Sequence, residues 1–303
     1  MIVRELMREM TEMLRAAGVE DARFDARQLL KGALGLDTAH YLLWEQRELS
    51  ALFPEEELRR KLRRLRRDCE RRAAREPLQQ ILGETIFYGL RFLVNEDVLC
   101  PRQDTELLVE RVIKDYENVD KSALRVLDLC TGSGCIALSL ASCGGFPDVS
   151  AADISEAALA LAEKNRAALL GEEKGSLRLL RSDLFEALSG ECFDIIVSNP
   201  PYIPTAVIDT LSPEVREHEP RIALDGHADG LYFYRRITEE AGRFLRAGGR
   251  LYVEIGYDQG ECVQELFLRA GFTEVRLCQD LGGNDRLVCG RRSGYNMIPV
   301  YKV

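Results

Sequence analysis

Hydrophobic positions in residues 1–83 recur at the spacing of helices. One apolar stripe, at positions i, i+4, i+7, i+8 and i+11, consists of Ala22, Ala26, Leu29, Leu30 and Ala33. This spacing predicts a helix that Asp21 can cap and that Gly35 ends. Further helices are expected over Val3–Ala17 and Thr38–Leu49, and another begins near Pro54. The inner face of this last helix is expected to consist of Leu58, Leu62, Leu65 and Cys69. Because no polar cluster in this part looks catalytic, we expect a helical bundle for docking or support.

The hydrophobic pattern changes in the middle of the chain. Between Ile81 and Leu99, aromatic residues and glycines indicate a short hairpin that links two domains. After residue 123, short apolar runs alternate with helical segments, which is typical of a doubly wound α/β sheet of the Rossmann type. The expected strands are 125–129, 149–153, 177–180, 193–198, 250–255, 272–278 and 286–289. The strand 250–255 is expected to follow a helix that stops at Gly248-Gly249.

Composition adds the class of protein. A length of 303 residues allows about two domains, and the 46% hydrophobic and 30% charged content is that of an ordinary globular protein. No run of about 18 apolar residues occurs, so no membrane span is expected. The N-terminus lacks the apolar segment of a signal peptide. Nine scattered cysteines and three histidines disfavour a metal site and fit reduced thiols, so a cytoplasmic location is expected.

Charge is unevenly distributed along the chain. The net charge of −9 disfavours a polyphosphate surface as the main partner. Between Arg59 and Arg75, however, ten Lys or Arg residues stand against Asp68 and Glu70. A basic helix of this kind is either a solvated face or a docking site for an acidic protein or an RNA, and both readings stay open.

The tetrapeptide Asn199-Pro200-Pro201-Tyr202 ends the apolar run 193–198 and carries the most specific chemistry. The Asn199 side-chain oxygen and the Pro200 carbonyl are two acceptors for the two N–H bonds of a planar NH2 group. Proline fixes φ and removes competing backbone donors, and the ring of Tyr202 can stack on a planar group. The tetrapeptide therefore indicates chemistry at an sp2 nitrogen, such as adenine N6, cytosine N4 or a carboxamide nitrogen.

A cofactor loop follows the first predicted strand. The segment Cys130-Thr131-Gly132-Ser133-Gly134, continued to Ala137, contains G-x-G-x-x-A between a strand and a helix. Glycine permits the tight turn and the close backbone approach that such a loop requires. Asp153 lies 19 residues after Gly134, at the end of the second strand, where a carboxylate can accept both ribose hydroxyls. This order of elements, in which a strand is followed by a glycine loop, a helix, a second strand and an acidic residue, predicts a site for a nucleoside cofactor.

Three acidic or apolar positions favour S-adenosylmethionine over a dinucleotide. This cofactor has no phosphate, and its cationic methionine end suits a carboxylate such as Asp128. After the third predicted strand, Asp183 can face the adenine amino group and Leu184 the adenine ring, although Asp183 could instead be a helix cap.

The chain resembles the HemK-type (PrmC family) peptide chain release factor glutamine-N5 methyltransferases over nearly its whole length. The similar segments are Arg75–Gly83, Phe87–Phe92, Val98–Glu106, the glycine loop, Asn199–Tyr202 and Glu219–Leu231. The Pro-Arg…Thr-Glu and Glu-Pro…Asp-Gly-Leu segments discriminate this family from DNA amino-methyltransferases, which share Asn-Pro-Pro-Tyr. Departures from the family pattern include Cys130, where glycine is usual, Gln80, Gln103-Asp104 and His227.

The resemblance implies a Rossmann-like class I methyltransferase domain with an N-terminal helical domain. The expected parts are a docking domain at 1–83, a hairpin linker at 84–100, an S-adenosylmethionine-dependent domain at 101–290 and a tail at 291–303. The implied activity is methylation of the glutamine amide nitrogen in the Gly-Gly-Gln motif of release factors. A monomer without a direct nucleic-acid substrate is expected.

A carboxamide nitrogen is a poor nucleophile because its lone pair is delocalised. Acceptors at Asn199 and Pro200 would orient it toward the methyl group, with Pro201 and Tyr202 completing the substrate site. The proton can leave after transfer, so no Asp or His general base is expected. Two alternatives stay open: a DNA or RNA amino-methyltransferase of the adenine N6 type, and a non-catalytic cofactor-binding interaction protein.

Overall fold

The computed structural model describes residues 2–171 and 176–293. Residues 294–303 of the expected tail lie outside the described residues. The chain forms two compact units. The helical unit comprises Met1–Glu84 and Leu211–His218, and the sheet unit comprises Thr85–Thr210 and Glu219–Val303. The segment Leu211–His218 therefore belongs with helices that precede it by more than a hundred residues in the chain, which the hydrophobic pattern did not predict.

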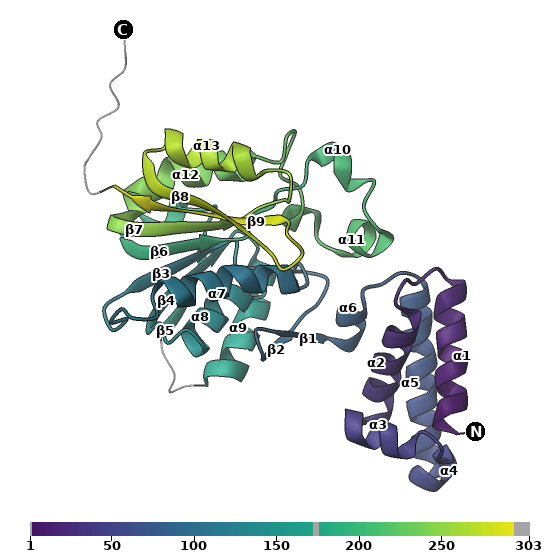
Figure 1. Cartoon of the computed structure of the whole chain (residues 1–303). Helices are drawn as coiled ribbons and strands as arrows, with labels where there is room; N and C mark the ends of the chain where they lie inside the picture. The colour runs from purple at the N-terminus through teal and green to yellow at the C-terminus, as the bar shows by residue number, and fades with distance from the viewer. Residues whose placement is uncertain (1, 172–175, 294–303) are drawn as a thin grey trace. The chain divides into compact units, whose positions relative to one another are not determined.

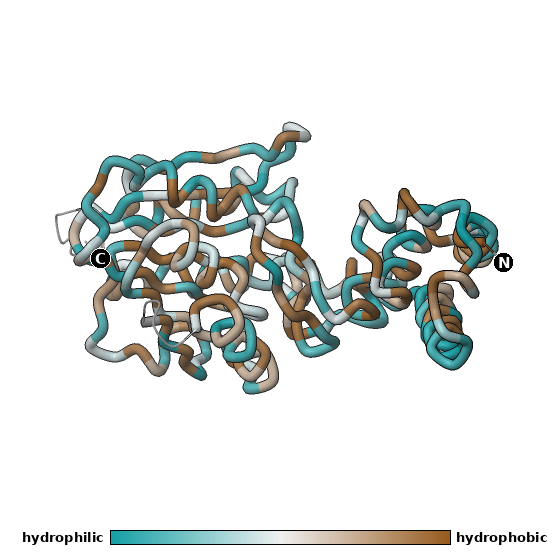
Figure 2. Tube along the Cα trace, turned by 90° about the horizontal axis from the view of Figure 1, so that it is seen from below, coloured by the Kyte–Doolittle hydropathy of each residue, from teal (hydrophilic) through white to brown (hydrophobic). Residues whose placement is uncertain are grey.

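Short and long helices build the helical unit (Figure 1). They are α1 (Val3–Ala16), α2 (Ala22–Leu34), α3 (Thr38–Trp44), α4 (Leu49–Leu52), α5 (Glu55–Ala73), α6 (Leu78–Leu82) and α11 (Pro213–His218). The predicted stripe on α2 is confirmed, because all five of its residues are buried in the core of this unit. Figure 2 shows hydrophobic and hydrophilic positions on different sides of the helices in this unit. On α5, Leu65 and Cys69 are buried, whereas Leu58 and Leu62 are only partly buried.

Two local predictions for this unit were wrong. Asp21 precedes α2, but its side chain makes no capping hydrogen bond. The helix expected over 38–49 is instead α3 and α4 with a break between them. The reason for the break lies at the start of α1, where the backbone N–H groups of Val3 and Arg4 donate to the carbonyls of Arg47 and Glu45. The first N–H groups of a helix have no partner within that helix, and here these carbonyls accept from them. Because they bond to α1, the same carbonyls do not accept the hydrogen bonds that would continue α3.

Buried charges join α2, α5 and α11 inside the helical unit. Arg72 Nε donates to Asp25 Oδ2 over 2.6 Å, and Arg72 Nη1 donates to Glu214 Oε1 over 3.0 Å. Arg75 contacts both oxygens of Glu214, at 2.6 and 2.7 Å, in a bidentate pair. The carboxylate of Glu214 thus fastens α11 to the end of α5.

The sheet unit is a seven-stranded sheet with the order β5-β4-β3-β6-β7-β9-β8. The strands are β3 (Arg125–Leu129), β4 (Asp148–Asp153), β5 (Ser176–Arg181), β6 (Phe193–Ser198), β7 (Leu245–Glu254), β8 (Phe272–Gln279) and β9 (Asp285–Arg292). The pairs from β5 to β7 are parallel, whereas β9 pairs antiparallel with β7 and β8. The predicted doubly wound α/β class is confirmed.

Helices cover both faces of this sheet (Figure 1). The helices are α7 (Glu106–Asp115), α8 (Cys135–Ser142), α9 (Glu156–Leu170), α10 (Thr205–Ile208), α12 (Tyr232–Phe244) and α13 (Gly260–Arg269). The described part of the chain also contains the 3-10 turns η1 (Gln103–Thr105), η2 (Glu186–Leu188) and η3 (Arg221–Ala223). One hydrophobic core includes side chains of α7 and α8, and a second core includes those of α12 and α13. Each face of the sheet is therefore buried under hydrophobic side chains and excluded from solvent.

The start of β7 differs from the prediction. The strand begins at Leu245 and continues through Gly248-Gly249, which were expected to end a helix. Gly248 has φ +81°, and a Cβ on Gly249 would lie 2.9 Å from the Asp194 carbonyl. The register shifts here, since Phe193 pairs with Leu245 but Ile195 pairs with Arg250. The glycines therefore form an irregularity within the strand rather than a helix stop.

A two-stranded hairpin of β1 (Glu84–Phe87) and β2 (Leu90–Leu93) is present where it was predicted. Its turn is Tyr88-Gly89, with φ +49° and +75°, as a two-residue hairpin turn of type I′ requires. Its role as a linker stays a prediction. Among the described residues, no helix is long and apolar enough to cross a membrane.

Candidate active site

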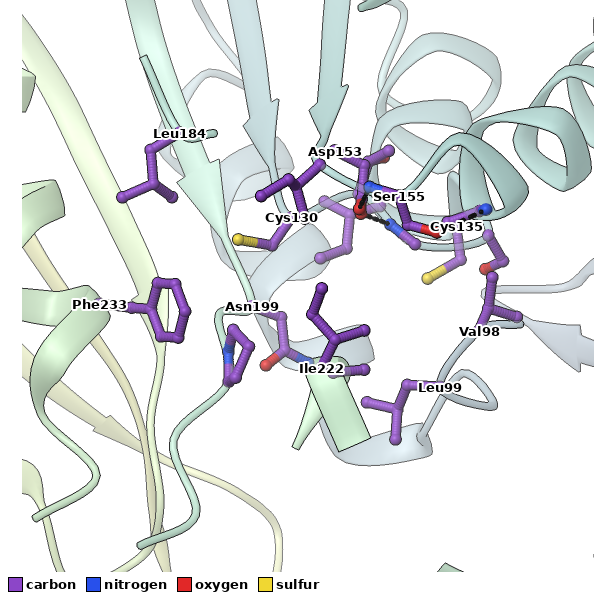
Figure 3. A pocket seen from close by; sticks show the side chains of 18 of the residues that line it. Val98, Leu99, Cys130, Cys135, Asp153, Ser155, Leu184, Asn199, Ile222 and Phe233 are labelled. Atoms are coloured by element: carbon purple, nitrogen blue, oxygen red, sulfur yellow. Dashed lines mark hydrogen bonds between the residues drawn. The ribbon is translucent and has the colours of Figure 1, made fainter. Parts of the chain in front are cut away.

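A cavity of about 300 Å³ lies in the sheet unit, lined by the loops that follow β3, β4, β5 and β6 (Figure 3). The strand order reverses between β3 and β6, and ligands of open α/β sheets bind outside the carboxyl ends of strands at such a switch point. Figure 3 shows Leu184 and Phe233 on one side of the cavity and Val98 and Leu99 on the other. A cavity of this size with apolar walls and few polar groups is typical of a small-molecule site.

The glycine loop lies between β3 and α8, as predicted. Cys130, Thr131, Gly132 and Ser133 line the cavity, but Gly134 does not. Gly134 has φ +81°, and a Cβ there would lie 3.2 Å from Leu138 and 3.3 Å from Ala162, so this glycine allows α8 to approach α9. Cys130 adopts φ +58°, a left-handed conformation that costs a non-glycine residue about 1–2 kcal/mol. This conformation explains why glycine suits the position better.

Asp153 ends β4 and faces the cavity (Figure 3). Its Oδ2 accepts a hydrogen bond from the Gly132 N–H over 2.8 Å, and its Oδ1 accepts one from the Ser155 N–H over 2.9 Å. Burial raises the pKa of this carboxyl, and the two backbone donors oppose the rise. Each oxygen keeps a lone pair for a further donor, such as a ribose hydroxyl.

Asp128 does not line the cavity, although it was predicted to contact the cofactor. The residue is fully buried, and its Oδ2 accepts hydrogen bonds from Thr131 Oγ1 over 2.6 Å and from the Ala137 N–H over 3.2 Å. Burial raises its pKa to about 7. The geometry gives Asp128 a supporting position behind the glycine loop, and its direct contact with a cofactor stays a prediction.

The predicted substrate tetrapeptide is divided between the cavity and the core. Asn199 and Pro201 line the cavity, whereas Pro200 and Tyr202 are not part of its wall. Burial raises the pKa of Tyr202, whose ring packs against the core formed with α12 and α13. The Asn199 Nδ2 donates to Thr105 Oγ1 over 3.3 Å, which leaves its Oδ1 to accept from a ligand.

The loop around residues 226–230 approaches this tetrapeptide closely. A Cβ on Gly226 would lie 2.7 Å from the Tyr202 carbonyl carbon, and one on Gly230 would lie 2.3 Å from the Tyr202 oxygen. Both positions therefore require glycine, which accounts for the two Asp-Gly pairs in the sequence. The Tyr202 carbonyl also accepts from Gln259 Nε2 over 3.0 Å.

Comparison with known proteins decides the family. The domain family described as "PrmC N-terminal domain" matches residues 5–83, and "Methyltransferase small domain" matches residues 102–211. A release factor glutamine methyltransferase of Geobacter sulfurreducens is 46% identical over 90% of this chain and 91% of its own length. One of Caulobacter vibrioides is 42% identical over 92% of each chain. The chain belongs to the release factor glutamine methyltransferases.

Members of this family are S-adenosylmethionine-dependent methyltransferases, which confirms the predicted enzyme class and cofactor. Among solved structures, the hMettl16 catalytic domain in complex with MAT2A 3′UTR hairpin 6 shares the fold, with a TM-score of 0.52 and 16% identity. That match covers 78% of this chain and 82% of that chain. A carboxylate at Asp153, an amide at Asn199 and apolar walls fit a cationic nucleoside that carries no phosphate.

Asp183 and Leu184 both line the cavity of this methyltransferase. Asp183 Oδ1 accepts from Arg236 Nη1 over 2.8 Å, so an adenine amino group would compete with, or add to, this ion pair. The alternative of a helix cap is not supported, because Ser182 Oγ accepts from the Ala187 N–H over 3.0 Å at that turn. The individual ligand roles of these residues stay predictions.

Sequence reasoning missed several residues at this site. Ile222, Phe233 and Arg236 line the cavity, and Arg102 forms an ion pair with the buried Glu219. Burial raises the pKa of Glu219 to about 7. The signal that could have found Glu219 is the Glu-Pro…Asp-Gly-Leu segment, which was used only for the resemblance. Within the described residues, no group of His, Cys, Asp or Glu could hold a metal ion.

Glu254 is the other missed residue. It ends β7 and is 2% exposed, and no motif in the sequence pointed to it. Burial raises its pKa to about 7, whereas the nearby Arg286 acts in the opposite direction. The signal available in the sequence was a single acidic residue at the end of an otherwise apolar strand.

Proposed function

We propose that this chain methylates the side-chain amide nitrogen of the glutamine in the Gly-Gly-Gln motif of peptide chain release factors. The observation that carries the proposal is the orientation of Asn199 in the cavity wall. Its Nδ2 is engaged by Thr105, so its Oδ1 is the atom offered to a substrate NH2 group. The Pro200 carbonyl would accept the second N–H bond.

When bound, S-adenosylmethionine would supply the methyl group. A bond would form between the amide nitrogen and the methyl carbon, the sulfur would leave with the electron pair of the broken carbon–sulfur bond, and the N–H proton would pass to water. The chain's residues orient the amide and favour the positive charge that develops on its nitrogen. Cys130–Ser133 and Asp153 would hold the nucleoside, and Asp183 and Leu184 would face the adenine. Pro201 and Tyr202 would support the acceptors from the wall and the core.

The release factor as the substrate is supported by the names of the similar proteins from Geobacter sulfurreducens and Caulobacter vibrioides. A nucleic-acid substrate is disfavoured by the net charge of −9. We further propose that the chain acts as a monomer in the cytoplasm, where translation termination takes place. The docking role of the helical unit is part of this proposal.

A methyl-transfer assay with three acceptors tests the proposal. The chain is incubated with radiolabelled S-adenosylmethionine and either whole release factor, oligonucleotide DNA or RNA, or no acceptor. We expect label only in the release factor, on the glutamine of its Gly-Gly-Gln motif by mass spectrometry. Label in the oligonucleotide alone would favour the amino-methyltransferase alternative, and label in neither would favour a non-catalytic module.

A further inference from the structure

The side chain of Asn165, on α9, joins two segments of the chain beside the cavity. Asn165 is only 1% exposed. Its Nδ2 donates to the Leu93 carbonyl over 3.1 Å and to the Ser133 carbonyl over 2.9 Å, and its Oδ1 accepts from the Leu93 N–H over 2.7 Å. Leu93 ends β2 of the hairpin, whereas Ser133 belongs to the glycine loop and lines the cavity. One buried amide therefore connects the hairpin to the cofactor loop.

These partners fix the direction of the Asn165 amide. A backbone carbonyl can only accept and a backbone N–H can only donate, so the NH2 group faces the two carbonyls and the oxygen faces the Leu93 N–H. On the other side of the bonded loop peptide, the Gly134 N–H donates to the Thr131 carbonyl over 2.9 Å. The peptide between Ser133 and Gly134 is thus held from both sides.

The same face of α9 holds the segment that follows the hairpin. Ala158, Leu161 and Asn165 are three and four residues apart, so they share one side of the helix. Ala158 and Leu161 pack with the buried Val98 in a small hydrophobic cluster, and Val98 lines the cavity (Figure 3). The strand β2 also contacts α9. Two parts of the cavity wall, the glycine loop and the segment around Val98, therefore rest on α9.

Support of the hairpin accounts for only part of this arrangement. A strand at the edge of a sheet needs partners for its backbone, and the two bonds with Leu93 supply them. These bonds use the Asn165 oxygen and one of its N–H groups. The second N–H group is directed to Ser133, which is not part of the hairpin. The bond to Ser133 therefore serves the glycine loop.

We propose that Asn165 is a positioning residue that couples the hairpin to the glycine loop and thereby sets the affinity for S-adenosylmethionine. A loop that is already held in one conformation loses less conformational entropy when a ligand binds to it. The coupling is reciprocal, because a bond that favours cofactor binding is itself favoured by the bound cofactor. The inference concerns the cofactor and does not rest on the identity of the methyl acceptor.

Hydrogen exchange of the wild-type chain tests the coupling without any substitution. The Leu93 N–H exchanges when its bond to Asn165 opens, so saturating S-adenosylmethionine should slow its exchange about tenfold. The amides of β8 provide the control, because this strand lies at the edge of the sheet and lines no part of the cavity. Their exchange should be the same with and without the cofactor. An unchanged Leu93 rate in the presence of bound cofactor would overturn the proposal.

Two substitutions separate the hydrogen bonds from the charge of the cofactor. Asn165→Leu removes all three bonds at similar volume, and Asn165→Asp keeps an acceptor for the Leu93 N–H but, when ionised, has no donor for Ser133. We expect the Kd for S-adenosylmethionine, measured by calorimetry, to rise about tenfold in both variants, the scale of one net hydrogen bond. The response of Leu93 exchange to the cofactor should disappear. Asn118→Leu and Asn118→Asp make the same changes at an exposed position and should keep the wild-type Kd.

A purely structural role predicts a different pattern. The variants would then unfold at lower temperature by circular dichroism, but the folded chain would keep the wild-type Kd, and this result would refute positioning. For the positioning role, the KM for S-adenosylmethionine should rise while kcat at saturating cofactor stays within about threefold of the wild type. If neither Asn165 variant folds, the wild-type exchange decides: slower Leu93 exchange with cofactor supports the coupling, and an unchanged rate refutes it.

Discussion

The two units of this chain treat buried charge differently. In the helical unit the buried charged residues Asp25, Asp68 and Arg72 all form ion pairs. In the sheet unit, buried polar atoms without a partner among the described residues are Arg111 Nε, Asp128 Oδ1, Ser133 Oγ, Ser139 Oγ, Glu219 Oε2, Arg250 Nη1 and Glu254 Oε2. Every atom of this kind within the described residues belongs to the sheet unit.

This difference matches a division between structure and chemistry. Paired charges such as Arg72 with Asp25 and Glu214 join helices and leave no group free to react. The carboxyls of Asp128, Glu219 and Glu254, each with a pKa raised to about 7 by burial, lie around the cavity loops and the tetrapeptide. Proteins keep such costly groups mainly where function needs them. The comparison teaches that the active site is the part of this fold that is not optimised for stability.

The largest expected effect comes from breaking the chemistry of the sheet unit at Asn199. Asn199→Ala removes one oriented acceptor, and we expect a loss of about 2–4 kcal/mol of transition-state stabilisation, by analogy with other oriented hydrogen bonds in catalysis. Steady-state kinetics with release factor measures this loss. The cofactor affinity should persist, as should the activity of the control Asn118→Ala at an exposed position. A parallel loss of cofactor affinity would assign Asn199 to the cofactor instead.

A smaller effect is expected at the ribose position. Asp153→Ala removes a carboxylate that faces the cavity, and hydrogen bonds to charged groups are worth about 1.5–3 kcal/mol, so the Kd for S-adenosylmethionine should rise roughly 30-fold. Calorimetry measures the Kd. Asp148, at the opposite end of β4, is the matched control, and Asp148→Ala should keep the wild-type Kd. An unchanged Kd for Asp153→Ala would show that the ribose assignment is wrong.

The strands and the glycine loop were predictable because each is recorded in a short stretch of sequence. The runs around β3, β4 and β6 are apolar since both faces of the sheet are buried. In the loop from Cys130 to Gly134 the backbone adopts positive φ angles, and the glycines in the sequence indicate this conformation. The order of strand, glycine loop, helix and second strand then predicts that Asp153 lies at the cofactor site, without any knowledge of tertiary contacts.

The remaining features depend on contacts between distant segments. Thr105 and Asn199 meet only after the sheet has formed, so no local pattern connects them. The same holds for Glu214, whose partners Arg72 and Arg75 precede it by more than 130 residues. The break after α3 also arises from tertiary contacts, because the start of α1 uses the carbonyls of Glu45 and Arg47.

Glu214 provides a test of the paired charges in the helical unit. Although burial alone would raise the pKa of Glu214, hydrogen bonds and ion pairs with Arg75 and Arg72 hold it at about 2. Glu214→Gln should lower the stability of the helical unit by about 2 kcal/mol, as measured by hydrogen exchange of α2 and α5 in the whole chain. Exchange in the strands β3 and β6 should not change.

The pH dependence of this stabilisation has a definite sign. The pKa of Glu214 is lower in the folded state than in the unfolded state, where it is about 4.3. Its contribution is therefore fully present above the unfolded pKa and is lost as the pH falls toward 2. The neighbouring Glu217 on α11 is exposed, and Glu217→Gln should leave exchange unchanged. Equal exchange in the wild type and Glu214→Gln at pH 7 would remove the structural role of this carboxylate.

The smallest effect is expected on the surface of α5. Most of its basic residues already form ion pairs, including Arg64 and Arg67 with Asp68, so their charge is largely used inside the helical unit. Arg60 and Arg63 are exposed and form no ion pair with any described residue.

If the helical unit docks an acidic face of the substrate protein, these two arginines are the ones that steer it, since unpaired surface charge acts mainly on association. Arg60→Glu with Arg63→Glu should therefore lower kcat/KM for whole release factor by about threefold at low salt, and the difference should disappear at high salt. Methylation of a short Gly-Gly-Gln peptide should not change, because a peptide reaches the cavity without the docking surface. An equal loss on protein and peptide would point to a folding defect, whereas no loss on either would establish α5 as a solvated face.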